Sequence, residues 1–104
     1  MGYPVSRGNT STSLQFLMVL SVDHVTGATG KLPTVELKKN GETAFAPAVG
    51  AVTEVGNGWY QVAASALDTN VLGPMLLHAT ASACDPRDDT FTVVNYRPAS
   101  LPAL

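Results

Sequence analysis

Apolar and polar positions alternate along several short stretches of this chain, and a two-residue period is typical of β-strands. The stretch 13–22 carries apolar residues on both of its faces, which predicts a strand that is buried on both sides. Further strands are predicted in residues 34–38, around Phe45, in residues 52–56 and 59–62, and in residues 75–83 and 90–96. The core expected from these patterns consists of Phe16, Met18, Leu20, Val35, Leu37, Val62, Leu77 and Val93.

Turn signals divide these strands. Asn57-Gly58 stands between two apolar runs, and this dipeptide tolerates the positive φ angles of a two-residue hairpin turn. Asn40-Gly41 predicts a second hairpin in the same way. Residues 64–74 are the one stretch in which a helical turn fits, but the stretch is short and ends at Gly73-Pro74, so we interpret it as a loop. The sequence therefore predicts an all-β fold, a single antiparallel β-sandwich of about seven strands.

Trp59 and Tyr60 follow the first turn directly and must point to opposite faces of their strand. One ring can thus anchor the core while the other stays near the surface. Because Trp59 stands where the strand enters the packed layer, we expect it in the core. Tyr60 is the candidate corner residue that pins one sheet to the other.

The two ends of the chain differ in composition from its middle. Residues 1–12 are rich in small polar residues, and residues 97–104 contain two prolines, which disfavour a central strand. We therefore divide the chain into an extended N-terminal arm (1–12), a β-sandwich domain (13–96) and an extended C-terminal arm (97–104). The arms are either frayed ends or segments that order against a neighbour, and Leu101 and Leu104 would favour burial in a groove.

Composition excludes several classes of protein. A chain of 104 residues suits one domain. Charged residues make up only 13% of the chain, against about 25% in typical globular proteins, so we expect partners to cover part of the surface. The net charge is −2 and the six basic residues are scattered, which argues against nucleic acid as a partner. The longest apolar run, residues 14–22, is too short to span a bilayer and lacks the basic region of a signal peptide.

Residues able to carry chemistry are few. Cys84 is the only cysteine, which excludes an intrachain disulfide, fits a reducing compartment, and favours a small packed residue over a reactive thiol. The two histidines are His24 and His78, and neither completes a nucleophile-and-base arrangement. Asp23-His24 is interpreted as a polar strand end that caps the next turn, with a ligand or a base as the alternative. His78 is interpreted as a half-buried strand residue.

Three carboxylates are grouped at Asp85, Asp88 and Asp89. Oxygen ligands in a loop can hold calcium, but the spacing differs from that of a dedicated calcium loop. A polar Asp-Pro turn at the tip of a strand connection is the simpler interpretation. We therefore predict no catalytic, cofactor-binding or metal-binding residues.

Several short motifs occur in an order that resembles a small module of tailed-bacteriophage virion structural proteins, found in tail, neck, baseplate and head-attached accessory proteins. The similarity covers about residues 12–90. Its most specific pieces are Asp23-His24 with Thr26-Gly27, Gly56-Asn57-Gly58-Trp59-Tyr60, Asp68-Thr69 with Leu72-Gly73, and His78-Ala79-Thr80. The resemblance implies an immunoglobulin-like sandwich without a catalytic role.

Two functions follow as expectations. In the first, the protein is not an enzyme but a structural subunit, present in multiple copies on the head, neck or tail of a phage particle. Its partners would be other virion proteins and copies of itself, and it would be located in the virion after assembly in the bacterial host cytoplasm. In the alternative, Trp59 or Tyr60 stacks on a sugar, and the domain binds a glycan or another component of the host surface.

Overall fold

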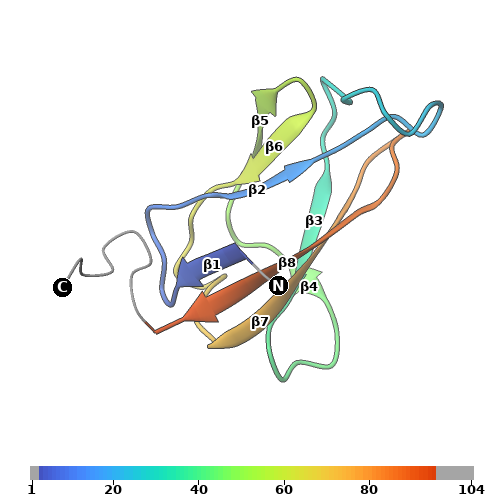
Figure 1. Cartoon of the computed structure of the whole chain (residues 1–104). Coiled ribbons are helices and arrows are strands. Elements are labelled where there is room, and N and C mark those ends of the chain that lie inside the picture. The colour runs from blue at the N-terminus through green and yellow to red at the C-terminus, as the bar shows by residue number, and fades with distance from the viewer. Residues whose placement is uncertain (1–2, 96–104) are drawn as a thin grey trace.

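The computed structural model describes residues 3–95, which contain no helix and form two facing β-sheets (Figure 1). Apolar residues from both sheets make one continuous core, an arrangement consistent with a β-sandwich. The strands are β1 (Tyr3–Ser6), β2 (Leu14–Leu17), β3 (Thr34–Lys38), β4 (Ala46–Pro47), β5 (Val52–Gly56), β6 (Trp59–Val62), β7 (Gly73–Thr80) and β8 (Arg87–Val94). The predicted all-β class is confirmed.

The strand order is β1-β8-β7-β3-β4 in the larger sheet and β2-β6-β5 in the smaller sheet. Neighbouring strands are antiparallel, with the exception of β1, which runs parallel to β8. The sequence pattern did not predict this parallel pair. The chain crosses between the sheets four times, after β1, β2, β4 and β6, so each sheet is built from segments that are distant in sequence.

The predicted hairpin at Asn57-Gly58 is confirmed. β5 and β6 pair in antiparallel register across it, and the two turn residues have φ angles of 55° and 90°, as a primed two-residue turn requires. β3 and β4 also form an antiparallel pair, with a turn at Asn40-Gly41 in which Gly41 has a φ of 88°. Residues 39–45 join the two strands, however, so this is not the two-residue hairpin that the dipeptide predicted. Residues 64–74 form a loop without a helix until β7 begins at Gly73.

The strand predicted over residues 13–22 is shorter in the structure. β2 ends at Leu17, and Val19 and Leu20 make only isolated bridges, to Gly27 and Cys84. The chain then turns away, because the His24 N–H donates to the Leu20 carbonyl at 2.8 Å. Val22, which the pattern placed on the same face as the core residues, is consequently 84% exposed.

Seven of the eight predicted core residues are buried, and the eighth, Leu20, is partly buried against the core. The expectation that Trp59 lies in the core is wrong. Tyr60 is 1% exposed and stacks on Phe16, its cross-strand partner, whereas Trp59 is 45% exposed. Because side chains alternate along a strand, only one of the two rings can face the core. Tyr60 is the one that does, because the register of β6 with β2 places it opposite Phe16.

The N-terminal segment is not an extended arm over its whole length. Tyr3–Ser6 form β1 at the edge of the larger sheet, and Val5 is buried in the core. Beyond β1, Asn9 is buried and its N–H donates to the hydroxyl of Thr69 at 2.9 Å. Part of the N-terminal segment is therefore held by contacts within its own chain, namely the burial of Val5 and the hydrogen bond of Asn9. The sequence pattern had offered contact with a neighbouring molecule as the way to order this segment. The predicted C-terminal arm, residues 97–104, lies outside the described residues.

Candidate functional site

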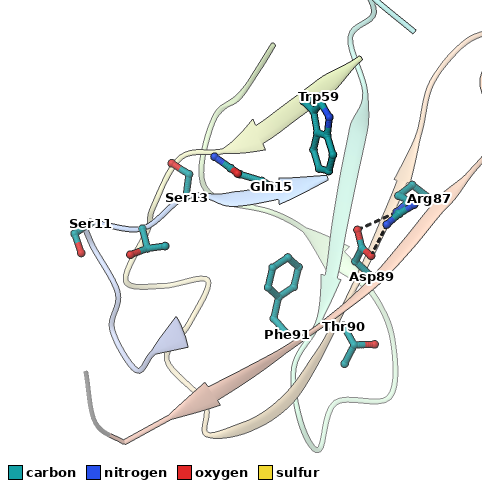
Figure 2. Close-up of a pocket in the computed structure, with 9 residues that line it drawn as sticks. Ser11, Ser13, Gln15, Trp59, Arg87, Asp89, Thr90 and Phe91 are labelled. Atoms are coloured by element: carbon teal, nitrogen blue, oxygen red, sulfur yellow. Dashed lines mark hydrogen bonds and ion pairs between the residues drawn. The ribbon is translucent and has the colours of Figure 1, made fainter. Parts of the chain in front are cut away.

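A groove lies beside Trp59 in the described part of the chain. It has a volume of about 610 Å³ and lies between β2 of the smaller sheet and β8 of the larger sheet (Figure 2). Ser11, Thr12, Ser13 and Gln15 line it from the β2 side, and Arg87, Asp89, Thr90 and Phe91 from the β8 side. Trp59 contributes the remaining wall. The groove thus joins an aromatic surface to several side chains that can form hydrogen bonds.

Trp59 reaches the groove because of its place at the start of β6, where its cross-strand partner is Leu17 of β2. Since Tyr60 faces the core, the indole of the adjacent Trp59 faces away from the core and remains 45% exposed. Trp59 is also the single tryptophan of the chain. A half-exposed indole has the shape and the polar N–H suited to stacking against a ligand or a partner chain.

The opposite wall holds an ion pair between Arg87 and Asp89. The Arg87 guanidinium donates two hydrogen bonds to the Asp89 carboxylate, with Nε–Oδ2 and Nη2–Oδ1 both at 3.0 Å. Both residues lie on the same face of β8, because they are two positions apart. Hydrogen bonding to Asp89 raises the pKa of Arg87 above its ordinary value. The pair fixes both side chains in one orientation at the groove.

Tyr60, the candidate corner residue, connects the core to the loop between β2 and β3. Its hydroxyl donates to the Ala28 carbonyl at 2.7 Å and accepts from the Lys31 N–H at 2.9 Å. That loop carries the chain from the smaller sheet to the larger one, so the tyrosine ties the crossover to β6. Its ring does not line the groove of Trp59 and, at 1% exposure, is not available to stack on a sugar.

Two of the motifs that carry the phage resemblance, Thr26-Gly27 and the run from Gly56 to Tyr60, meet in this same region. A Cβ atom added to Gly27 would lie 2.2 Å from the carbonyl oxygen of Asn57, and one added to Gly58 would lie 2.6 Å from the Cα of Gly27. The hairpin turn and the crossover loop therefore touch through their backbones, which only glycine allows. These motifs specify packing and supply no reactive group.

Asp68 and Thr69 serve a second structural junction. The buried carboxylate of Asp68 accepts hydrogen bonds from the N–H groups of Val49 and Gly50, at 2.8 and 2.9 Å. Thr69 accepts the hydrogen bond from Asn9 described above. Together they hold the chain before β5 and the segment after β1 against the loop that precedes β7. Each buried polar group is thereby satisfied.

The remaining candidate residues are dispersed. Asp23 caps the turn after residue 22: its carboxylate accepts from the N–H groups of Val25 and Thr26, both at 3.0 Å, and from the Thr26 hydroxyl. These hydrogen bonds lower the pKa of Asp23 from 3.8 to about 2, with the Thr26 hydroxyl as the largest cause. The capping interpretation of Asp23 is confirmed.

The three grouped carboxylates each form an ion pair or hydrogen bond with a different side chain. Asp85 pairs with Nδ1 of His24, and Asp88 pairs with Nδ1 of His78, each at 2.6 Å, while Asp89 pairs with Arg87. Within residues 3–95, no group of three or more His, Cys, Asp or Glu side chains is placed to hold a metal ion. His78 is half-buried on β7, as predicted, with Phe45 beside its ring.

Cys84 lies next to the core. It is partly buried, packs against the core residues and forms an isolated bridge with Leu20, and its Sγ lies 3.4 Å from the Ser82 carbonyl. This agrees with the interpretation as a small packed residue.

Apolar side chains are also exposed in the loop between β2 and β3 and on the larger sheet. Val25 and Leu32 are exposed in the crossover loop, and Leu76 and Phe45 are exposed beside His78. No helix formed by the described residues is long and apolar enough to cross a membrane. Scattered apolar residues of this kind are ordinary on a protein surface, whereas a charged fraction of only 13% is low.

The groove residues on β2 and β8 were not predicted from the sequence. Two weak signals were present: Gln15 is the one polar residue in the apolar run of residues 14–20, and Arg87 and Asp89 are spaced for one strand face. Neither signal brings β2 next to β8, because the two strands belong to different sheets and are far apart in the chain. A scan against protein-family models and searches of curated proteins and of solved structures found no match to this chain.

Proposed function

We propose that this protein is a non-enzymatic structural subunit of a bacteriophage particle, located on the head, neck or tail and packed against other virion proteins and further copies of itself. The observation that carries the proposal is the low charge of the chain, in which only 13% of the residues are charged, against about 25% in typical globular proteins. A surface with few charges costs little to remove from water, so neighbours in an assembly can cover it. The resemblance of several motifs to a module of tailed-bacteriophage virion proteins favours a phage particle as that assembly.

The proposal includes an immunoglobulin-like fold. In that fold, strands B, E and D lie in one sheet and strands C, F and G in the other. Assigning these letters in chain order makes β2, β5 and β6 the strands B, D and E, and makes β3, β7 and β8 the strands C, F and G. The order β2-β6-β5 in one sheet, with β3-β7-β8 adjacent in the other, supports the assignment.

The described residues offer support for a packing role over a catalytic one. The ionisable side chains that the sequence singled out are used in pairs or caps: Asp23 caps a turn, and Asp85, Asp88 and Asp89 pair with separate partners. The Asp89 carboxylate, which shares the groove with the hydroxyls of Ser11, Thr12, Ser13 and Thr90, is held by the Arg87 guanidinium. The buried carboxylate, Asp68, holds two backbone N–H groups.

Analysis of purified particles tests this proposal. Mass spectrometry of virions from the phage whose genome encodes the chain should find the protein in a fixed ratio to the major capsid or tail protein. Electron microscopy should then show it at symmetric positions, with the surface around Leu76 and Phe45 covered by neighbours. Absence of the protein from washed particles would contradict the proposal.

A second candidate, binding of a host-surface glycan, is favoured by one observation. Trp59 is half-exposed next to a groove whose other walls carry Gln15 and the fixed Arg87–Asp89 pair. Sugars bind proteins through an apolar ring face combined with planar polar groups. A glycan array probed with the wild type and with Trp59→Ala tests it: binding by the wild type alone supports the glycan site, and absence of binding by both excludes it on that array.

A further inference from the structure

The outer edge of β2 has no neighbouring strand among residues 3–95, because the smaller sheet has the order β2-β6-β5. The Met18 N–H donates to the Gly58 carbonyl at 2.9 Å, which continues the register of β2 with β6. Bonded and non-bonded residues alternate in an antiparallel pair, so the backbone groups of Gln15 and Leu17 are directed away from β6. β2 therefore offers N–H and C=O groups to an added strand.

β8 is also open on the other side of the groove. β1 pairs with β8 only at Phe91–Val94, so residues 87–90 have β7 on one side and no described strand on the other. The groove of about 610 Å³ lies between this open half of β8 and the edge of β2 (Figure 2). An extended segment that pairs with β2 would direct side chains toward Trp59 and Phe91, which line the groove.

Residues 97–104, with the sequence RPASLPAL, have the chemistry of such a segment. In an extended chain, backbone groups point to alternate edges, so Pro98 and Pro102 fall on the same edge. Proline lacks an N–H and cannot donate to a neighbouring strand. The opposite edge, which includes Ala99 and Leu101, keeps its donors and acceptors. The segment can therefore pair on one side only, as the last strand of a sheet does, and Leu101 supplies an apolar side chain for the groove.

The path of the chain indicates which molecule provides the segment. The Arg7 N–H donates to the Val94 carbonyl at 2.8 Å, and the turn that follows leads into β2, so β8 ends near the start of β2. The chain's own C-terminal residues would have to enter the groove from that end and run parallel to β2. A segment from another copy can enter from the opposite end and run antiparallel, which is the more stable pairing.

We propose that residues 97–104 of a second copy of this chain add to β2 as an antiparallel strand and fill the groove beside Trp59. Each copy then receives one segment and donates another, a head-to-tail contact that extends into a ring or a filament. The inference rests on the proposed function only in requiring that copies of the chain meet. Strand addition explains how copies would join without a large flat interface.

Sedimentation velocity on the purified full-length protein, over a series of concentrations, tests the inference. We expect self-association that Gln15→Pro abolishes and Gln15→Ala preserves. Proline at position 15 removes an outward N–H and leaves the bonds to β6 in place, because Gln15 is a non-bonded position in that pair. Leu101→Asp, which changes only the donated segment, should abolish self-association as well. If Gln15→Pro fails to fold by circular dichroism, Leu101→Asp carries the test.

A synthetic peptide of residues 97–104 provides an independent measurement. It should dissociate the wild-type oligomer and shift the fluorescence of Trp59, the single tryptophan, whereas a peptide with Leu101 replaced by Asp should do neither. A wild type that stays monomeric at all concentrations overturns the inference, as does self-association that survives both Gln15→Pro and Leu101→Asp. Detection of the protein in virions is a separate experiment, so either proposal can fail without the other.

Discussion

The hydroxyl of Tyr60 and the carbonyl of Ala28 are joined by a hydrogen bond of 2.7 Å, between the middle of β6 and the loop that crosses from one sheet to the other. The same hydroxyl accepts from Lys31. We expect Tyr60→Phe to lower the free energy of unfolding by about 1–3 kcal/mol, the range for leaving a buried hydrogen-bond partner unsatisfied. Urea unfolding of both proteins measures the difference. A variant with wild-type stability would show that water replaces the hydroxyl.

Trp59 and Tyr60 should differ in their contribution to stability. Tyr60→Ala removes a ring that is buried against Phe16 and should cost about 3–5 kcal/mol. Trp59→Ala removes a half-exposed ring and should cost about 1 kcal/mol, near the centre of ordinary substitutions. Thermal unfolding followed by circular dichroism suits both variants, since it does not depend on the tryptophan. Equal losses for the two variants would contradict the assignment of Tyr60, and not Trp59, to the core.

The Asp23 cap predicts a dependence of stability on acid. Hydrogen bonds lower the folded-state pKa of Asp23 from 3.8 to about 2, so the folded state holds the ionised carboxylate more strongly than the unfolded state. The stabilisation is present above the unfolded value of 3.8 and is lost as the pH falls through about 2. We expect the difference in Tm between the wild type and Asp23→Ala to shrink between pH 4 and pH 2.

A carboxyl NMR titration checks the same cap without a change in sequence. The Asp23 resonance should titrate with a midpoint near 2. A midpoint close to 3.8, the ordinary value for aspartate, would mean that the turn does not hold the carboxylate in solution.

The contact of Gly27 with the hairpin turn leaves no space for a side chain. A Cβ atom there would lie 2.2 Å from the Asn57 carbonyl oxygen, which belongs to the backbone and cannot rotate away. Gly27→Ala should therefore destabilise the fold by about 3 kcal/mol or more, at the upper end of the range for overpacking. Gly30→Ala is the matched control in the same loop: it meets nothing within 4 Å but has a φ of 69°, and should cost about 1 kcal/mol. Similar stabilities for the two variants would contradict the close backbone contact.

Features that depend on local chemistry were predictable from the sequence. The Asn57-Gly58 turn, the alternation that buries Val35 and Leu37, and the capping role of Asp23 each depend on residues close together in the chain. The choice between Trp59 and Tyr60 for the core was not predictable in this way, because both fit the alternation. It depends on the register with Phe16 in another strand.

The groove was beyond sequence reasoning for the same physical reason. Its walls come from β2 and β8, which share no ladder of hydrogen bonds and are separated by about seventy residues of chain. The N-terminal strand was missed because Tyr3–Ser6 contain Pro4 and only a short apolar pattern, and proline is tolerated there since β1 lies at the edge of its sheet. β1 is stabilised by its pairing with β8, and the amino-acid composition of residues 3–6 does not indicate that pairing.

The parallel pairing of β1 with β8 determines how this domain would respond to mechanical load. Tyr3 pairs with Phe91 and Ser6 with Val94, so a force that pulls residue 3 and residue 95 apart acts along both strands in opposite directions. The hydrogen bonds of this pair are then loaded together in shear, and they must break nearly at once. An antiparallel terminal hairpin pulled from its two ends would instead open one bond at a time. The shear geometry of the β1–β8 pair therefore resists separation of residues 3 and 95 better than such an unzipping geometry would.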